Sequence, residues 1–139
     1  MYKLAELSDL PTCLEIAKKF VEFYGLEYHE PSVERMLTHI LTNGVFILAL
    51  DGSKIKGGAG ALHAQNPWNQ TELVYQEMFW WVEEEYRNTT VGIKLLLELE
   101  KLAPAGSKII MSILPHSNFK HSTMEKLGYS LKELSYVKE

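Results

Sequence analysis

The chain has 139 residues, of which 46% are hydrophobic and 23% charged, and this ordinary globular usage excludes a disordered or fibrous protein. Its formal net charge of −4 disfavours a protein that mainly binds nucleic acid, because such proteins carry a surplus of Lys and Arg. The single cysteine, Cys13, excludes an internal disulfide, and no apolar run approaches the roughly 18 residues that span a bilayer. We therefore expect one cytoplasmic domain over residues 1–139, without nucleic-acid or membrane partners.

The first half of the chain mixes helical and strand patterns. Pro11 marks the start of a helix whose apolar residues recur at helical spacing, and Asn43-Gly44 predicts a left-handed end for a second helix. The run 45–50 is apolar and of strand length, and Asp51-Gly52 after it is a hairpin signal. The expected elements are a strand over 2–7, helices over 10–24 and 32–42, and strands over 45–50 and 55–63.

The second half starts with a loop rich in Asn and Pro, followed by a strand with many aromatic and β-branched residues. A helix with a wide apolar face then ends before Pro104, because proline cannot continue a helix. The expected elements are a loop over 64–71, strands over 72–82, 108–114 and 129–137, and helices over 91–103 and 119–127. The order β-α-α-β-β-β-α-β-α-β predicts a mixed α/β fold.

The segment 81–94 passes from an apolar strand through a polar turn into an amphipathic helix, which is a typical anion site. N–H groups of the first helical turn lack partners, and a small residue such as Gly92 lets a phosphate approach closely. Arg87 adds a guanidinium group that can donate two parallel hydrogen bonds to an anion, and Thr89 and Thr90 add hydroxyl groups. An ordinary capped helix with a solvated arginine fits the same local pattern equally well.

This segment resembles motif A of the GNAT N-acetyltransferases, Q/R-x-x-G-x-G/A, with Arg87, Thr90 and Gly92 on its defined positions. A second segment, Met124 to Tyr129, is similar to the family's C-terminal Y-E-K-L-G-F. The resemblance covers the whole chain and implies a mostly antiparallel, twisted sheet flanked by about four helices. It also implies that strands four and five splay apart beside a β-bulge and that acetyl-CoA inserts between them.

The resemblance implies a set of residues around the cosubstrate. The backbone at the end of strand four would pair with the pantetheine arm, and the following turn would surround the pyrophosphate. The expected cofactor-binding residues are Trp81, Val82, Arg87, Asn88, Thr89, Thr90, Val91, Gly92, Lys94, Asn118 and Lys120. No metal is expected, because the three consecutive carboxylates of Glu83-Glu84-Glu85 on a turn do not converge on one ion.

Transfer of an acetyl group requires that the acceptor ammonium first lose a proton. Glu77 is the candidate base, and its aromatic neighbours would raise its pKa by desolvation. A solvated carboxylate is the equal alternative, because a shift of one residue in register reverses the face of a strand. The N–H of Val82, at the expected bulge, would stabilise the tetrahedral intermediate.

The acceptor itself is not identified by the sequence, and both small-molecule and protein amines fit. An acceptor cleft is expected to be lined by aromatic residues among Phe23, Tyr24, Tyr28, Trp68 and Trp80, of which Tyr28 and Trp68 are the candidate acceptor-binding residues. Two positions depart from the family pattern: Asn88-Thr89-Thr90 replaces a glycine-rich turn, and Met124 stands where many members have a proton-donating tyrosine. Two functions therefore remain open, an active N-acetyltransferase and a GNAT-fold binding module without catalysis. A homodimer is compatible with either.

Overall fold

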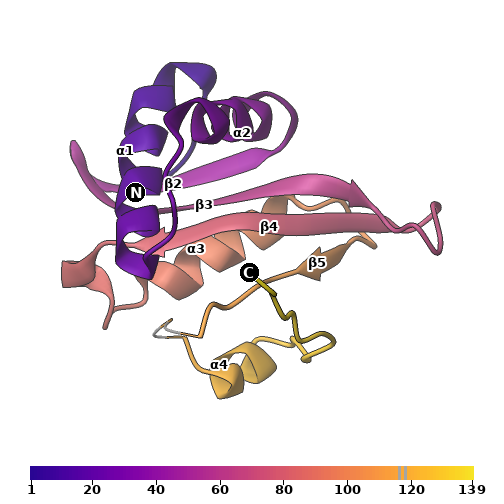
Figure 1. Ribbon diagram of the computed structural model, residues 1–139. Helices are drawn as coiled ribbons and strands as arrows, with labels where there is room; N and C mark the ends of the chain where they lie inside the picture. The colour runs from indigo at the N-terminus through magenta and orange to yellow at the C-terminus, as the bar shows by residue number, and fades with distance from the viewer. Residues whose placement is uncertain (116, 118) are drawn as a thin grey trace.

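The computed structural model describes residues 1–115, 117 and 119–139, and these contain a five-stranded sheet in the order β1-β2-β3-β4-β5 (Figure 1). The strands are β1 (Tyr2–Leu4), β2 (Val45–Asp51), β3 (Lys54–Gln65), β4 (Leu73–Val82) and β5 (Lys108–Ile110). Neighbouring strands are antiparallel from β1 to β4, whereas β5 runs parallel to β4. The mostly antiparallel sheet that the resemblance implied is therefore confirmed.

Four α-helices occur in the described residues: α1 (Leu10–Tyr24), α2 (Glu30–Asn43), α3 (Val91–Leu102) and α4 (His121–Lys126). Helices α1 and α2 cover one face of the sheet and α3 covers the other, while α4 follows β5 (Figure 1). Short 3-10 turns precede α1 at Leu7–Asp9 and follow β4 at Glu84–Tyr86. No helix in the described part of the chain combines the length and hydropathy needed to cross a bilayer.

The sheet separates two hydrophobic cores. The face toward α3 buries Ile47, Ala49, Ala59, Ala61, Tyr75, Trp80, Val82, Val91, Leu95, Leu96, Leu99 and Met124. The face toward α1 and α2 buries Ala5, Cys13, Ile16, Ala17, Leu37, Ile40, Phe46, Leu48, Phe79 and Trp81. Because β2 is covered on both faces, its sequence is an almost continuous apolar run rather than an alternating one.

Two glycines that follow helices have different roles. Gly25 ends α1 with φ of 64°, a left-handed conformation that glycine adopts without steric cost. The same conformation was predicted for Gly44 after α2, and that prediction is wrong, because φ of Gly44 is −118°. A Cβ at Gly44 would overlap the backbone oxygen of Ala61, so glycine is required there by the close approach of β3.

Two of the predicted strands are shorter than expected. The first strand was predicted over 2–7 but ends at Leu4, because the chain turns into the 3-10 turn Leu7–Asp9. The strand predicted over 108–114 covers Lys108–Ile110, since only these residues pair with β4. The chain leaves β4 at this point, and this departure creates the cleft described below.

The final strand predicted over 129–137 is not formed, because residues 129–139 contain no strand. Only its first residue is anchored. The Tyr129 hydroxyl donates to Glu100 Oε1 at 2.7 Å, and the Tyr129 N–H donates to the Met124 carbonyl at 2.9 Å. Leu131 and Tyr136 are exposed beyond this point. An alternating pattern makes a strand only where a sheet edge offers backbone partners, and the sequence could not reveal that this edge is unused.

Candidate functional site

The site begins with a β-bulge in β4. Ala61 of β3 pairs with Glu77 and the preceding residue Gly60 pairs with Phe79, so Met78 is an extra residue without a partner. Residues three apart in a regular strand face opposite sides, but this insertion places Glu77 and Trp80 on the same face, toward α3. The open question of register is thereby answered, since the side chain of Glu77 is buried and not solvated: the residue is only 8% exposed.

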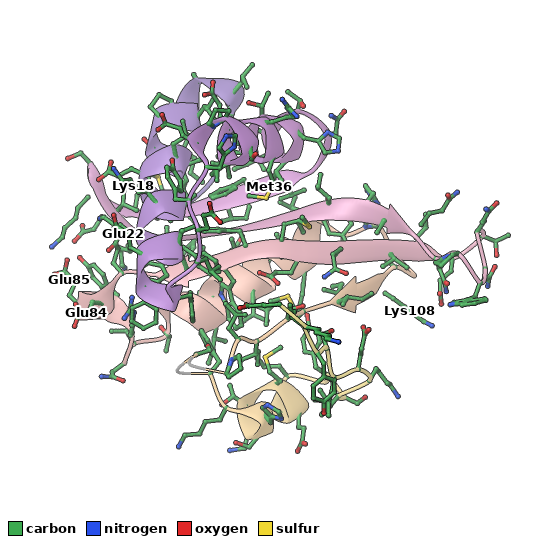
Figure 2. All side chains as sticks on the ribbon, in the orientation of Figure 1. Lys18, Glu22, Met36, Glu84, Glu85 and Lys108 are labelled. Atoms are coloured by element: carbon green, nitrogen blue, oxygen red, sulfur yellow. The ribbon has the colours of Figure 1, made fainter. Side chains whose placement is uncertain are left out.

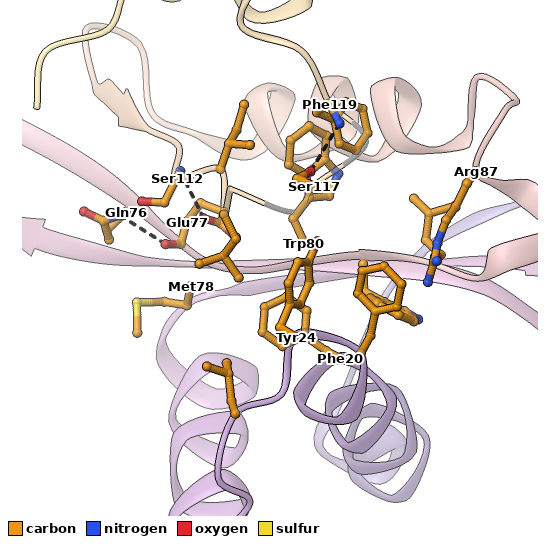
Figure 3. Close-up of a pocket in the computed structure, with 16 residues that line it drawn as sticks. Phe20, Tyr24, Gln76, Glu77, Met78, Trp80, Arg87, Ser112, Ser117 and Phe119 are labelled. Carbon is orange, nitrogen blue, oxygen red and sulfur yellow. Dashed lines mark hydrogen bonds between the residues drawn. The ribbon is translucent and has the colours of Figure 1, made fainter. Parts of the chain in front are cut away.

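The cleft lies where β4 and the chain after β5 separate. The two strands pair only from Val74–Gln76 to Lys108–Ile110, and beyond these residues they diverge, which confirms the predicted splay. A cavity of about 440 Å³ opens between them (Figure 3). It is lined by Phe20, Phe23, Tyr24, Leu26, Gln76, Glu77, Met78, Trp80, Trp81, Val82, Arg87, Ser112, Ile113, Leu114, Ser117 and Phe119.

Glu77 is the acidic group of this cavity. Burial raises the pKa of the Glu77 carboxyl to about 7, while the Ser112 N–H opposes this shift by donating to Oε2 at 3.3 Å (Figure 3). A carboxylate with a pKa near neutrality is suited to accept a proton at physiological pH. The geometry is therefore compatible with the role of base that the sequence suggested.

The backbone groups at the end of β4 alternate between β3 and the cleft. The Glu83 N–H donates to the Lys56 carbonyl at 2.9 Å, on the side of β3. Because amide groups alternate along an antiparallel strand, the N–H groups of Trp80 and Val82 point away from β3, toward the open side. The bulge was expected near Val82 but lies at Met78, so the Val82 N–H belongs to a regular part of the strand.

Some backbone hydrogen-bonding groups of the turn between β4 and α3 are paired with a side chain of the same turn. The Thr89 hydroxyl donates to the Tyr86 carbonyl and accepts the Val91 N–H at 3.3 Å. The N–H groups of Gly92 and Ile93, in the first turn of α3, have no partner within the helix. Asn88, Thr89 and Thr90 are exposed, as is Lys94 one turn further on.

The carboxylates of this turn do not converge. Figure 2 shows Glu84 and Glu85 directed away from the sheet, and both are exposed. Glu85 pairs with Lys54 at 2.9 Å, and Glu83 pairs with Lys19 of α1 at the same distance. The described residues hold no group of three side chains that could ligate a metal ion.

Arg87 lies against aromatic rings. Its Nε donates to the Val82 carbonyl at 3.0 Å, and its guanidinium carbon lies 4.3 Å from the ring centroid of Phe23 and 4.5 Å from that of Trp81. The side chain therefore packs on the α1 side of β4. The Trp81 Nε1 is buried and has no hydrogen-bond partner among the described residues.

Gly92 lies beneath an aromatic ring. Phe119 stacks on Trp80 with ring centroids 3.9 Å apart, and a Cβ at Gly92 would overlap the Phe119 ring. The Trp80 Nε1 also donates to the Gly92 carbonyl at 3.2 Å. In this conformation the small size of Gly92 is required by ring packing, which is a tertiary contact that the local sequence pattern does not contain.

The other predicted residues lie as follows. Tyr28 donates to Glu30 at 3.4 Å and is not among the residues that line the cavity. Trp68, which is 94% exposed, lies on the connection between β3 and β4 and does not line the cavity either. Lys120 is exposed at the start of α4, and Asn118 lies outside the described residues.

Met124 packs in the core on the α3 face and is 7% exposed. The side chain at this position is therefore a structural one in this chain. Other residues of the cavity were not predicted, notably Phe20 and Leu26 near the end of α1, and Ser112 and Phe119 after β5. Phe23, Tyr24 and Trp80, which the sequence suggested as lining of an acceptor cleft, do line the cavity.

No protein-family model and no curated protein matches the chain. Solved structures do match over its whole length. The chain superimposes on a "predicted acetyltransferase with acetyl-CoA" from Clostridium acetobutylicum with a TM-score of 0.79 and 17% identity, covering 100% of this chain and 95% of that one.

Two further structures extend the comparison. One is a ribosomal-protein-alanine N-acetyltransferase from Brucella melitensis, with a TM-score of 0.73, 14% identity and coverage of 100% of this chain and 99% of that one. The other is an aminoglycoside acetyltransferase from an uncultured soil sample in complex with sisomicin, with a TM-score of 0.70, 12% identity and coverage of 100% and 96%. The splayed sheet, the order of elements and these superpositions agree that the chain has the GNAT acetyltransferase fold.

Proposed function

We propose that the chain transfers the acetyl group of acetyl-CoA to a primary amine. The observation that carries this proposal is a buried carboxyl, Glu77, at the point where β4 and the chain after β5 diverge. Its pKa of about 7 matches the task of a general base, and it lies in a fold that one structural relative uses in a complex with acetyl-CoA.

The cosubstrate fits the open side of β4. The N–H groups of Trp80 and Val82 offer strand-like hydrogen bonds to the amides of a pantetheine arm. The first-turn N–H groups of Gly92 and Ile93, together with the helix dipole, suit a pyrophosphate. Phe119 covers Gly92 in the described conformation, so binding at this point requires that its ring move.

Further contacts to the pyrophosphate are assigned from the resemblance to motif A, and one of these residues, Asn118, lies outside the described residues. We assign this role to the residues named from the sequence: Arg87, Asn88, Thr89, Thr90, Val91, Lys94, Asn118 and Lys120. Arg87 would exchange its contacts with aromatic rings for a phosphate oxygen, whereas Lys94 and Lys120 are exposed and free to reorient.

The reaction follows from these positions. Glu77 accepts a proton from the acceptor ammonium, and the free amine attacks the thioester carbonyl. The Val82 N–H stabilises the negative oxygen of the tetrahedral intermediate. The carbon–nitrogen bond is complete in this intermediate and its nitrogen is positively charged. On collapse the carbonyl re-forms, the carbon–sulfur bond breaks and the coenzyme A thiolate leaves with the electron pair, while the nitrogen releases its second proton to water. A thiolate is a stable leaving group near neutral pH, so it can take up a proton from water.

A binding module without catalysis is the second candidate, and Met124 is the observation that favours it. A thioether cannot donate a proton, and the Met124 side chain is packed in the core at 7% exposure. The two candidates differ in one property. Only the enzyme releases coenzyme A in proportion to the amine supplied.

The test is release of free thiol from acetyl-CoA in the presence of a panel of primary amines. We expect turnover whose kcat rises with pH through about 7 in the wild-type protein. Glu77→Gln should lower kcat by about 100-fold and remove this rise, whereas Glu98→Gln, at a partly exposed position of α3 outside the cavity, should change neither. Binding of acetyl-CoA without thiol release from any amine would instead support the binding module.

A further inference from the structure

The cavity has two walls of different character, one on each face of β4. The α3 face contributes Trp80, Val82 and Phe119, beside the backbone groups that suit the pantetheine arm. The opposite wall comes from α1, the residues just after it, and β4. This acceptor wall consists of Phe20, Phe23, Tyr24, Leu26, Met78 and Trp81. All six of its side chains are apolar or aromatic.

The rings of the acceptor wall hold one another in place. Phe20 lies 4.8 Å from Tyr24 and 6.1 Å from Trp81, and Phe23 lies 5.5 Å from Trp81, measured between ring centroids. The angles between the paired rings of the wall are between 54° and 86°, which are the favourable tilted and edge-to-face arrangements. Four aromatic rings linked by these contacts form a preorganised apolar surface.

The charged groups of the cavity lie at its two ends. Figure 3 shows Glu77 and Arg87 on opposite sides of Trp80. Among the described lining residues, Glu77 is the only one with an acidic side chain and Arg87 the only one with a basic side chain. The cavity therefore offers one site for an ammonium group, at Glu77, and none at the other end.

The end of the cavity at Arg87 disfavours a second ammonium. The Arg87 guanidinium lies 4.3 Å and 4.5 Å from the ring centroids of Phe23 and Trp81, and its positive charge repels a second cation at this end of the cavity whether Arg87 contacts these rings or a phosphate oxygen. The Trp81 Nε1 beside it is a hydrogen-bond donor, and an ammonium group requires acceptors. Repulsion from Arg87 thus acts against a polycation, and the Val82 carbonyl at this end already accepts a hydrogen bond from the Arg87 Nε.

We propose that the acceptor is a primary monoamine carried on an apolar, ring-bearing body. This inference rests on the proposed acetyl transfer and adds the class of acceptor. The ammonium binds at Glu77 and the ring packs against the acceptor wall, where burial of its apolar surface supplies the affinity. Polyamines and aminoglycosides carry several ammonium groups, and a cavity with a single carboxylate leaves all but one of them unpaired.

The test compares acceptors of equal amine reactivity on the full chain with saturating acetyl-CoA. The panel contains phenethylamine, tryptamine, n-butylamine, spermidine, sisomicin and a lysine-containing peptide. We expect kcat/KM for the two ring-bearing monoamines to exceed that for n-butylamine and spermidine by about tenfold or more. A larger kcat/KM for spermidine, sisomicin or the peptide would overturn the inference.

A matched pair of variants tests the acceptor wall itself. Phe23 is 46% exposed near the end of α1, and Leu102 is 43% exposed at the end of α3, away from the cavity, so truncation of either should leave the fold intact. Phe23→Ala should raise KM for phenethylamine about fivefold to tenfold while leaving kcat/KM for n-butylamine within about twofold. Leu102→Ala should change neither. Equal effects of Phe23→Ala on both amines would contradict the role of the wall.

Failure of this inference can be told from failure of the proposed function. If acetyl-CoA binds and polycationic amines are acetylated best, the acceptor class is wrong while acetyl transfer stands. If acetyl-CoA produces no calorimetric signal, or binds without release of thiol from any amine, acetyl transfer is wrong and the acceptor class falls with it. The amine panel thus tests the acceptor class, while calorimetry and thiol release test acetyl transfer itself.

Discussion

Glu77 links the chemistry of the cleft to the stability of the fold. Its pKa in the folded protein is about 7, above the ordinary value of 4.5, because burial disfavours the charged form. The folded state therefore binds more protons than the unfolded state between these two values, and the free energy of unfolding must fall as pH rises through this window. A shift of this size corresponds to stability on the order of 3 kcal/mol, present in full below about pH 4.5 and lost above about pH 7.

The measurement is urea unfolding between pH 4.5 and 8. We expect that Glu77→Gln removes most of the decline, because an amide does not titrate in this range. Glu98→Gln, whose carboxylate is partly exposed and paired with Lys101 at 2.7 Å, should retain it. An identical decline in wild-type and Glu77→Gln proteins would show that Glu77 is ionised at no cost in the folded state.

The position of Glu77 illustrates what a sequence can and cannot reveal about a residue. Its aromatic surroundings predicted a raised pKa, and the strand that carries it was recognised. Its face was not, because the choice depends on the unpaired Met78, and a bulge leaves no mark in the pattern of one strand alone. Trp68, by contrast, lies exposed on a connection outside the cavity, and its contact with an acceptor stays a prediction.

At the scale of elements, the packing of Phe119 on the start of α3 can be tested by a double-mutant cycle. Gly92→Ala alone should destabilise the protein by about 1 to 3 kcal/mol, because the new Cβ overlaps the Phe119 ring. In a Phe119→Ala background the same change should be neutral or stabilising by up to about 1 kcal/mol, since alanine favours a helix over glycine. Additive effects in urea unfolding would mean that the two residues are not in contact.

The helices and the central strands were predictable because their patterns are long and repeat at one period. The residues at which these strands and helices end were not predictable, because they depend on contacts with elements that are distant in sequence. The strand after the third helix is cut to Lys108–Ile110 where β4 diverges, and Gly44 is required by its contact with β3 rather than by helix termination. Both features are set by the contact of one element with another, which the pattern of a single segment does not contain.

For the whole molecule, the segment after Tyr129 is expected to add little to stability. Its large apolar residues Leu131, Leu134, Tyr136 and Val137 are all exposed. Removal of residues 131–139 should therefore change Tm by less than about 2 °C, whereas Tyr129→Ala, which removes the bond to Glu100, should lower it further. A large loss of Tm in the truncated protein would show that this segment packs on the domain.

The central claim is that the cleft beside β4 binds acetyl-CoA, and calorimetric titration of the full chain with acetyl-CoA tests it most directly. We expect one site per chain and, in a parallel melt, stabilisation of about 2.7 kcal/mol once the ligand reaches 100 times its Kd. Gly92→Glu should abolish the signal and Lys101→Glu, at the far end of α3, should leave it intact. Absence of heat and of any change in Tm at millimolar acetyl-CoA would contradict the claim.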